Sequence, residues 1–423
     1  MNKIERLLHT LAPKGVEFKT LEEVFEIKNG YTPSKNNPEF WENGTIPWFR
    51  MEDLRENGRI LKDSIQHITP KALKGKKLFP KNSIIISTTA TIGEHALLIV
   101  DSLANQRFTF LSKKANCDLA LDMKFFFYQC FLLGEWCKNN TNVSGFASVD
   151  MTAFKKYKFP IPPLEIQQEI VKILDAFTEL NTELNTELNT RKKQYQYYQN
   201  MLLDFNDINS NHKDAKEKLA QKTYPKNLKT LLHTLAPKGV EFRKLGEVCD
   251  FQKGKSITKK AVTFGKVPVI SGGRQPAYYH NEANRSGETI AISSSGVYAG
   301  YVSYWDIPVF LADSFSVSPK QKTLMPKYLF HYLTTQQDAI HATKSTGGIP
   351  HVYSKDLQNF LIPIPPLEIQ QEIVKILDQF SILTTDLQAG IPAEIEARKK
   401  QYEYYREKLL TFKPLTPHKE VKK

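Results

Sequence analysis

Two short stretches contain residue types used in catalysis, and neither has a complete pattern. The Gly-Lys-Ser run at 254–256 has the end of a phosphate-binding loop, but it lacks the glycine that such a loop needs five residues earlier. Glu22, Glu23 and Glu26, followed by Lys28, have the residue types of a nuclease cluster, yet acidic residues beside a predicted strand are usually just solvated. We therefore predict no catalytic residue in this chain.

The four cysteines do not have the spacing of a metal site or of a disulfide framework. Cys117, Cys130, Cys137 and Cys249 include no C-x-x-C pair, and no histidine cluster lies near them in the sequence. We expect free, mostly buried thiols and no metal site.

The formal net charge of +13 is unevenly distributed along the chain. Basic residues outnumber acidic ones by 20 to 16 over 16–160 and by 14 to 9 over 240–363, whereas 161–205 has 4 basic and 7 acidic residues. This division favours polyanion binding by the first two segments and protein contact by the third. No apolar run is long enough for a membrane span and the N-terminus has no apolar signal core, so we expect a cytoplasmic protein without membrane contact.

Internal repeats define the elements that must position any binding residues. The segment IPPLEIQQEIVKILD occurs at 161–175 and again, unchanged, at 364–378. RKKQYQYYQNMLLDF at 191–205 returns in modified form at 398–412, and LLHTLAPKGVEF at 7–18 returns at 231–242. The chain is thus two copies of one unit, each with a lead segment, a long variable region and a long helix.

The stretch 161–205 predicts one long helix with a coiled-coil seam. It opens on prolines, which suit a helix start, and then runs about 40 residues without Pro or Gly. The apolar seam alternates steps of four and three and consists of Ile166, Ile170, Ile173, Phe177, Leu180 and Leu184. We expect it to pair with the second copy at 364–412, which should break at Gly390 and restart at Pro392.

The two variable regions predict irregular α+β domains built on one plan. In the first, strands are expected at 83–87, 96–100 and 107–111, and a buried helix at 123–137. In the second, strands are expected at 265–273 and 288–294 and a helix at 328–340, and both regions end in glycine-containing loops at 144–146 and 346–350. A shared scaffold with different loops is expected when two related domains recognise two different targets.

These motifs resemble the specificity (S) subunits of type I restriction-modification systems over the whole chain. The similarity rests on G-Y-T-P-S with T-I-P-W at 30–48, T-I-G-E-H-A with N-Q-R at 91–107, V-I-S-G-G-R at 269–274, and the duplicated P-P-L-E-I-Q-Q-E-I. The resemblance implies an α+β fold with two similar target-recognition domains, each a mixed sheet with helices, separated by two long antiparallel helices in an intramolecular coiled coil with pseudo-twofold symmetry. The predicted segments are 1–160, 161–205, 206–230, 231–363, 364–412 and a basic tail at 413–423.

The resemblance also implies a non-catalytic, DNA-recognising role. Each target-recognition domain would read one half of a bipartite double-stranded DNA site. The chain would recruit two adenine methyltransferase (M) subunits and two restriction (R) subunits, which would bind S-adenosylmethionine, ATP and Mg. No cofactor is expected in this chain, which lacks an Asn/Asp-Pro-Pro-Tyr/Phe amino-methylation motif and a glycine-rich cofactor loop.

A tetrapeptide repeat in the first long helix predicts a spacer. Thr-Glu-Leu-Asn occurs three times between Thr178 and Asn189, and each copy adds about 6 Å of helix and roughly 40° of rotation beyond one turn. The repeat also interrupts the three-four seam with steps of four. The copy number could set the gap between two half-sites, or the repeat could be ordinary helical filler.

Residue types suggest the DNA contacts, since Arg, Lys, Asn and Gln pair with base edges, and Lys, Arg, Ser and Thr bind phosphates. The candidates in the first domain, with its three lysines assigned to phosphates, are Arg50, Lys74, Lys76, Lys77, Ser87, Thr88, Thr89, Thr91, Gln106 and Arg107. The candidates in the second domain are Arg274, Gln275, Tyr278, Tyr279, Ser293, Ser294, Ser295, Thr346, Gly347, Gly348 and His351.

The long helices offer candidate surfaces for the methyltransferase. Identical partners need identical surfaces, and the duplicated positions are Glu165, Gln168, Glu169, Glu368, Gln371 and Glu372. The helix-end tyrosines could stack on bases, but the seam spacing of Tyr195, Tyr198, Tyr402 and Tyr405 favours packing between helices. The alternative function is a non-catalytic coiled-coil scaffold whose two lobes bind proteins or a structured RNA.

Overall fold

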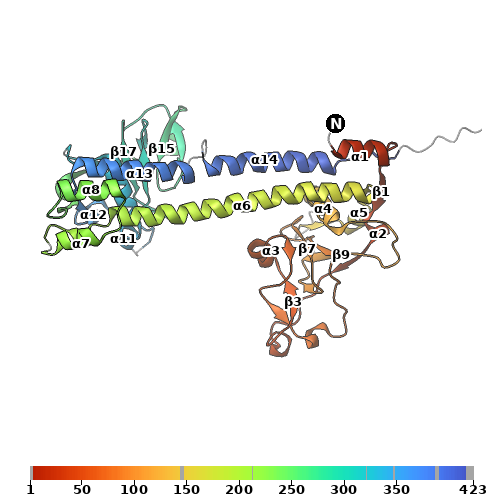
Figure 1. The fold of residues 1–423 in the computed structure, drawn as a ribbon. Coiled ribbons are helices and arrows are strands. Elements are labelled where there is room, and N and C mark those ends of the chain that lie inside the picture. Colours follow the sequence, from red (N-terminus) through yellow and green to blue (C-terminus); the bar gives the residue numbers. More distant parts are fainter. Residues whose placement is uncertain are drawn as a thin grey trace, which may run out of the picture. The chain divides into compact units, whose positions relative to one another are not determined.

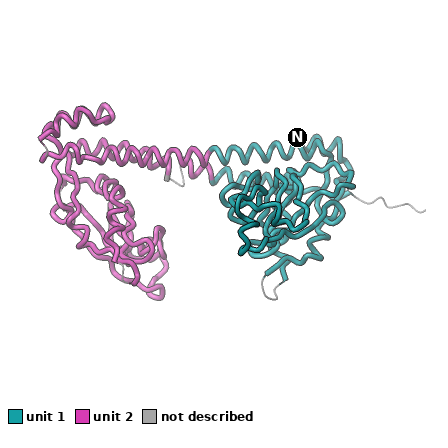
Figure 2. Tube along the Cα trace, turned by 90° about the horizontal axis from the view of Figure 1, so that it is seen from below, with its two compact units in different colours: residues 1–183, 396–423 teal, residues 184–395 magenta. Residues whose placement is uncertain are grey.

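The computed structural model describes residues 3–142, 147–211, 213–320, 322–345, 348–385 and 390–415. The chain forms two compact units, coloured separately in Figure 2: unit 1 contains residues 1–183 and 396–423, and unit 2 contains residues 184–395. The unit boundaries fall inside the long helices. The predicted segments treat the long helices as separate from the globular domains. In the structure, each half of a long helix packs into one unit, so the units include parts of the helices.

Unit 1 contains a globular α+β domain between a short N-terminal helix and the first long helix (Figure 1). Its helices are α1 (Lys3–Leu11), α2 (Leu21–Val24), α3 (Met51–Asn57), α4 (Met123–Asn139) and α5 (Met151–Lys155). Its strands are β1 (Glu17–Thr20), β2 (Phe25–Asn29), β3 (Ile46–Phe49), β4 (Ile60–Leu61), β5 (His67–Ile68), β6 (Ser83–Ser87), β7 (His95–Leu98), β8 (Leu103–Ala104), β9 (Phe108–Lys113), β10 (Thr141–Asn142), β11 (Ser148–Val149) and β12 (Lys158–Ile161). The main sheet has the order β2-β9-β6-β7-β4, and a smaller sheet has the order β5-β3-β8.

The core of unit 1 forms where α4 covers the main sheet. The predicted strand at 83–87 and helix at 123–137 are confirmed as β6 and α4, and every side chain of β6 is buried. The strand predicted at 107–111 is found as β9, and its first five residues are buried because it lies between β2 and β6 in the sheet. The aromatic face of α4 joins this core to the first half of the long helix.

Unit 2 repeats this architecture with different side chains. Its helices are α7 (Ala215–Gln221), α8 (Lys226–Leu235), α9 (Leu245–Val248), α10 (Pro326–Thr335), α11 (Gln337–Ala342) and α12 (Ser354–Leu357). Its strands are β13 (Phe242–Lys244), β14 (Cys249–Lys253), β15 (Val267–Ile270), β16 (Tyr278–His280), β17 (Thr289–Ser293), β18 (Val302–Trp305), β19 (Phe310–Leu311), β20 (Ser314–Pro319) and β21 (Leu361–Pro363). The orders β14-β20-β17-β18 and β16-β15-β19 match those of unit 1 strand for strand, except for β4. The helix predicted at 328–340 is divided into α10 and α11.

Three long helices form the coiled coil: α6 (Leu164–Leu203), α13 (Leu367–Thr385) and α14 (Ile391–Leu410). In unit 1, the Phe177 ring lies 5.7 Å from the Tyr405 ring of α14, and in unit 2 the Tyr198 ring lies 5.0 Å from the Phe380 ring of α13 (centroid distances). The first half of α6 thus contacts the end of the second helical strand and its second half contacts the beginning, so the two run antiparallel. The predicted seam packing of the tyrosines is confirmed for Tyr198 and Tyr405.

The helical boundaries refine two of the sequence predictions. Helix α6 begins at Leu164 rather than 161, because residues 158–161 form β12. The predicted interruption of the second copy is confirmed at Gly390, whose φ of +97° is open to glycine but strained for other residues. Pro392 lies in the first turn of α14, as expected. Residues 386–389, just before Gly390, lie outside the described residues.

A buried glutamine fastens each globular domain to its long helix. The Gln167 amide nitrogen donates to the Ala120 and Pro162 carbonyl oxygens at 2.8 and 2.7 Å, and its oxygen accepts from the Asp122 N–H at 2.8 Å. Gln370 makes the same three contacts, at 2.8, 2.7 and 2.9 Å, with Thr323, Pro365 and Met325 of unit 2. Both side chains have no exposed surface.

A Lys–Asp pair accompanies the glutamine in each unit. Nζ of Lys124 lies 2.6 Å from Asp175 in unit 1, and Nζ of Lys327 lies 2.6 Å from Asp378 in unit 2. Each pair joins the helix under the sheet, α4 or α10, to a long helix. The second unit therefore repeats both the buried amide and the ion pair of the first.

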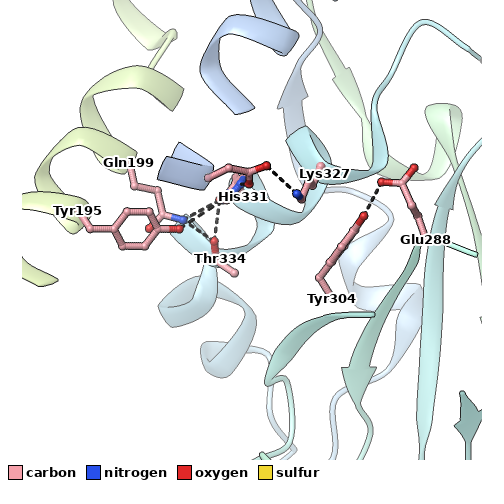
Figure 3. Close-up of polar contacts among 8 residues, drawn as sticks. Tyr195, Gln199, Glu288, Tyr304, Lys327, His331 and Thr334 are labelled. Carbon is pink, nitrogen blue, oxygen red and sulfur yellow. Dashed lines mark hydrogen bonds and ion pairs between the residues drawn. The ribbon is translucent and has the colours of Figure 1, made fainter. Parts of the chain in front are cut away.

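Figure 3 shows how this joint continues in unit 2. The buried His331 of α10 lies between α6 and α13, with Nδ1 3.3 Å from the Tyr195 hydroxyl and Nε2 3.2 Å from Asp378. Burial raises the pKa of Tyr195 to about 12, so its hydroxyl is protonated at neutral pH. On the sheet side the Lys327 ammonium lies over the Tyr304 ring. A chain of contacts thus runs from the sheet of unit 2 to both long helices.

We predict that Gln167→Ala and Gln370→Ala each destabilise their own unit. Each substitution leaves one N–H and two carbonyl groups without a buried partner, at a cost of about 1–3 kcal/mol in the free energy of unfolding. Gln168→Ala and Gln371→Ala are matched controls, because these neighbouring side chains are exposed. Chemical denaturation monitored by hydrogen exchange separates the two units, and equal effects of buried and exposed substitutions would contradict the role of the amide.

We predict that His95 makes unit 1 sensitive to acid. Burial, assisted by the nearby Arg59 charge, lowers the pKa of His95 to about 3, and the ring packs 4.6 Å from the Phe131 ring. Because the folded chain holds this side chain neutral, stability is lost as the pH falls below the unfolded pKa of about 6.5, by at most about 1.4 kcal/mol per pH unit. His95→Leu should show a smaller drop in Tm between pH 7 and pH 5 than the parent protein; an equal drop would show that other groups cause it.

Candidate nucleic-acid interface

A hollow at one edge of the small sheet of unit 1 collects several predicted DNA contacts. Strands β3 and β8 are parallel, with Trp48 opposite Leu103 and Phe49 opposite Ala104. Their carboxyl ends therefore open at the same edge, where ligands commonly bind in parallel sheets. The hollow has a volume of about 250 Å³, and its lining residues are Thr32, Lys35, Trp48, Arg50, Met51, Glu52, Asn105, Gln106 and Arg107.

Three side chains predicted from scattered positions thus meet in this hollow: Arg50, Gln106 and Arg107. The Arg50 backbone is fixed by its N–H, which donates to the Asp53 carboxylate at 2.6 Å. Its guanidinium lies 5.8 Å from the Trp48 ring centroid, close enough for a cation–π contact. Half-buried and held on one side, Arg50 has a defined direction into the hollow.

Sequence reasoning missed Thr32, Lys35 and Asn105, which also line the hollow. The stretch 32–38 contains two prolines, and by itself this pattern predicts only a turn. Lys35, between the two prolines, could have indicated a binding site, because a loop beside a strand end is a common place for a binding residue.

The predicted cluster at 87–91 is only partly accessible. Ser87 and Thr88 are buried: the Ser87 hydroxyl donates to the Thr89 carbonyl at 2.8 Å, and the Thr88 hydroxyl pairs with that of Thr109 at 3.0 Å. These two side chains support the loop rather than face solvent, which corrects their assignment as surface contacts. Thr89 is half-buried and Thr91 is exposed.

The three predicted phosphate-binding lysines are exposed. The Lys76 ammonium lies 3.8 Å from the Tyr31 ring centroid, and Lys74 lies 5.3 Å from the Phe40 ring. Tyr31 precedes Thr32 in the lining and accepts a hydrogen bond from the Trp48 indole at 2.9 Å. Lys77 is exposed beside them. Lys76 is thereby placed beside Tyr31, the residue next to Thr32 of the lining.

Unit 2 presents the equivalent edge at the ends of β15 and β19. These strands are parallel, with Val269 opposite Phe310 and Ile270 opposite Leu311. Beyond them lie the predicted Arg274, whose guanidinium is 5.0 Å from the Tyr298 ring, and Asp313, which accepts a hydrogen bond from the Ser295 hydroxyl. Asp313 and Tyr298 were not predicted.

The remaining predicted residues of unit 2 lie in different surroundings. Ser293 is buried and donates to the Ser271 carbonyl at 3.1 Å, so it too supports the loop, and Ser294 is half-buried. The exposed positions are Gln275, Tyr278, Tyr279 and Gly348. Thr346 and Gly347 fall outside the described residues.

An antiparallel bridge between Ser295 and His351 joins two loops at this edge. The bridge displays two apolar side chains that sequence reasoning also missed, Val297 and Ile349, which are 83% and 66% exposed. Exposed apolar tips of this kind appear in the sequence only as isolated residues in glycine-containing loops.

The two catalytic-looking stretches have structural roles. A side chain at Gly254 would meet the carbonyl oxygens of Leu311, Ala312 and Ser314 at 2.6–2.7 Å, and a site ringed by acceptors does not suit a phosphate. Glu23 caps α2 by accepting from the Thr20 N–H. Within the described part of the chain, no group of three His, Cys, Asp or Glu side chains is arranged to hold a metal, and no helix is long and apolar enough to cross a membrane.

The predicted docking positions lie at the starts of α6 and α13. Glu165, Gln168, Glu368 and Gln371 are exposed, whereas Glu169 and Glu372 are half-buried. Glu169 pairs with Lys3 of α1, so the N-terminal helix covers part of this surface in unit 1.

The fold and its two edges define a class of protein: an internally duplicated chain with two differently lined domains on a shared coiled coil. Comparison with known proteins identifies it. The model of the type I restriction modification DNA specificity domain matches residues 13–194 and 237–397. The specificity subunit of the type I restriction enzyme EcoprrI from Escherichia coli is 40% identical over 402 residues, which cover 92% of this chain and 93% of that protein. The Escherichia coli EcoR124I/EcoR124II specificity subunit is 33% identical over 313 residues, covering 66% and 70%.

A crystal structure supports the same fold. The type I restriction-modification S subunit from M. genitalium matches with a TM-score of 0.54 and 19% identity, covering 93% of this chain and 95% of that one. The chain therefore belongs to the family of type I restriction-modification specificity subunits, with two DNA specificity domains.

We predict that replacing Lys74, Lys76 and Lys77 by Gln weakens DNA binding equally for all sequences. If the three lysines bind phosphates, the slope of log K against log salt concentration should fall by about 0.9 for each phosphate that is no longer neutralised. Titration of the complex with fluorescent duplexes at several salt concentrations measures this slope. The control replaces Lys155, Lys156 and Lys158 by Gln and so removes the same amount of charge. These three lysines are exposed and lie in or near β12, which pairs with β1. Equal slopes for the two triple variants would place the phosphates elsewhere.

Proposed function

We propose that this chain is the non-catalytic subunit that selects the DNA sequence of a type I restriction-modification complex, with each globular domain reading one half of a bipartite site. The observation that carries this proposal is the repeated edge. The same parallel strand pair, β3-β8 or β15-β19, opens in each domain onto different polar side chains. Two copies of one frame with different linings suit two different half-sites.

The charge of each domain supports a nucleic acid as the ligand. Both globular regions carry an excess of basic residues, whereas the first long helix has an acidic excess. At the edges themselves, arginine and glutamine can pair with bases, and the exposed lysines beside them can bind phosphates. A surface that binds proteins does not need arginine and lysine gathered in one hollow, as Arg50, Arg107 and Lys35 are in unit 1.

The continuous helix α6 supports a role as spacer. Its 40 residues include all three Thr-Glu-Leu-Asn copies, so each copy adds helix rather than loop. Leu184 of the middle copy is buried, and the threonines at 178 and 182 donate to the carbonyl oxygens four residues earlier. At a rise of 1.5 Å per residue, α6 is about 60 Å long.

The partners in this proposal are two methyltransferase and two restriction subunits. They would bind S-adenosylmethionine, ATP and Mg, and the chain itself would hold no cofactor. The repeated positions Glu165, Gln168, Glu368 and Gln371 would dock the methyltransferase subunits, because their exposed side chains occupy equivalent places in the two units.

We predict that deleting Thr182–Asn185, one copy of the repeat, shortens the gap between the half-sites and leaves both half-sites unchanged. Four residues remove about 6 Å of helix, against about 3.4 Å per base pair, so the gap should shrink by about one or two base pairs. Co-expression with a type I adenine methyltransferase subunit, followed by mapping of methylated adenines by long-read sequencing, reads the motif directly.

The control for this deletion keeps the length and changes the side chains, for example Glu183→Gln with Glu187→Gln. It should leave the gap unchanged. If the deletion variant methylates a bipartite motif with an unchanged gap, the spacer role is wrong. If the complex assembles but methylates no bipartite motif, the proposed function itself is wrong.

A further inference from the structure

The hydrogen-bond pattern at the two edges aligns Arg107 of unit 1 with Asp313 of unit 2. The Thr88 N–H donates to the Arg107 carbonyl at 3.1 Å, and the Ser294 N–H donates to the Asp313 carbonyl at 3.0 Å. Thr88 and Ser294 occupy the same place, since each follows the central strand β6 or β17. The two reading edges therefore carry opposite charges at one equivalent backbone position.

Neighbouring contacts confirm this alignment. The Val149 N–H donates to the Thr88 carbonyl, as the Val352 N–H donates to the Ser294 carbonyl, each at 2.9 Å. On the other side, Gly30 and Gly254 donate to the carbonyl oxygens of the residues that follow Arg107 and Asp313, at 2.9 and 2.8 Å. The equivalence thus rests on backbone contacts on both sides of the position.

The surroundings of Arg107 favour a ligand rich in hydrogen-bond acceptors. Arg107 is exposed at the hollow and shares its lining with Arg50 and Lys35, so the cationic donors outnumber the one carboxylate of the lining, Glu52. In the major groove, guanine presents two acceptors, O6 and N7, and arginine is the side chain that most often binds them.

The surroundings of Asp313 favour a donor. The Ser295 hydroxyl donates to Oδ2, which fixes the direction of the half-buried carboxylate. The position lies close to the backbone of Gly272, where an added Cβ would be 3.8 Å from Oδ2. A carboxylate at a base edge accepts from the N4 amino group of cytosine.

We propose, on the basis of the proposed function, that Arg107 reads a guanine in the half-site of the first domain and that Asp313 reads a cytosine in the half-site of the second. Both residues act as specificity determinants at the same place in the two copies of the fold. The loop that carries them is three residues long in unit 1, Asn105 to Arg107, and two residues long in unit 2, Ala312 and Asp313, so the two side chains leave loops of different length.

The test uses the full chain in complex with its methyltransferase subunit and selects bound duplexes from two pools, each randomised in one half-site. Arg107→Gln should lose the preference for guanine at one position of one half-site by about tenfold or more, with the other half-site unchanged. Asp313→Asn keeps an oxygen for Ser295 and replaces the other by an amide donor. It should change the preference in the other half-site from cytosine to adenine, which asparagine binds through N6 and N7.

Three comparisons decide the outcome. Lys74→Gln should weaken binding to all duplexes equally and change no base preference. Arg107→Lys keeps the charge and should retain a weaker guanine preference; if it and Arg107→Gln both give only a uniform loss, Arg107 binds phosphate and the proposal is overturned for unit 1. Unchanged preferences in Asp313→Asn overturn it for unit 2. Absence of any bipartite selection by the parent complex is a different result, because it rejects the proposed function and not only the assignment of bases.

Discussion

A fully buried glutamine amide in each unit, Gln167 or Gln370, is the interaction on which the rest of the structure depends. It joins the proline segment before the long helix to the segment that starts the helix under the sheet, and so fixes how the helix leaves its domain. A buried amide with all its hydrogen bonds satisfied tolerates only one arrangement of these three segments. The helix segment around it is identical in both halves, and the contacts on the domain side use backbone groups, so the two domains are attached in the same way.

With the joint fixed, the two domains can differ elsewhere without loss of the fold. The strand orders are shared, and at Gly30 and Gly254 the end of a strand approaches the edge loop so closely that a side chain would collide with backbone oxygens. Because of these backbone constraints, the side chains just beyond β3, β8, β15 and β19 can differ between the two units while the backbone around them stays the same. The residues that differ between the two copies and the frame that they share are therefore separated in space.

The repeats and the prolines were sufficient to predict the two copies, the long helices and the break at Gly390, because these features follow from local sequence. The meeting of Arg50 with Gln106 and Arg107 could be expected in part, since both sets follow strands. Ser87, Thr88 and Ser293 were predicted as DNA contacts from their polar side chains alone, and all three are buried. The backbone contacts from 148–149 and 351–352 cover the ends of their strands. Leu174 was missed as a fully buried residue, because α6 packs on its globular domain as well as on its partner helix.

The net charge of the second region gives no indication of Asp313. General attraction to DNA and recognition of a DNA sequence would therefore depend on different features of the chain. The two globular regions have nearly the same net charge, yet the same backbone position carries Arg107 at one edge and Asp313 at the other. Long-range attraction depends on the summed charge and does not distinguish sequences. A carboxylate near a phosphate backbone opposes that attraction, so it is tolerable at a reading edge when a specific donor pairs with it. In our proposal, the residue that weakens general binding is the one that discriminates between bases. Net charge then indicates the class of ligand, and the edge residues would indicate the sequence.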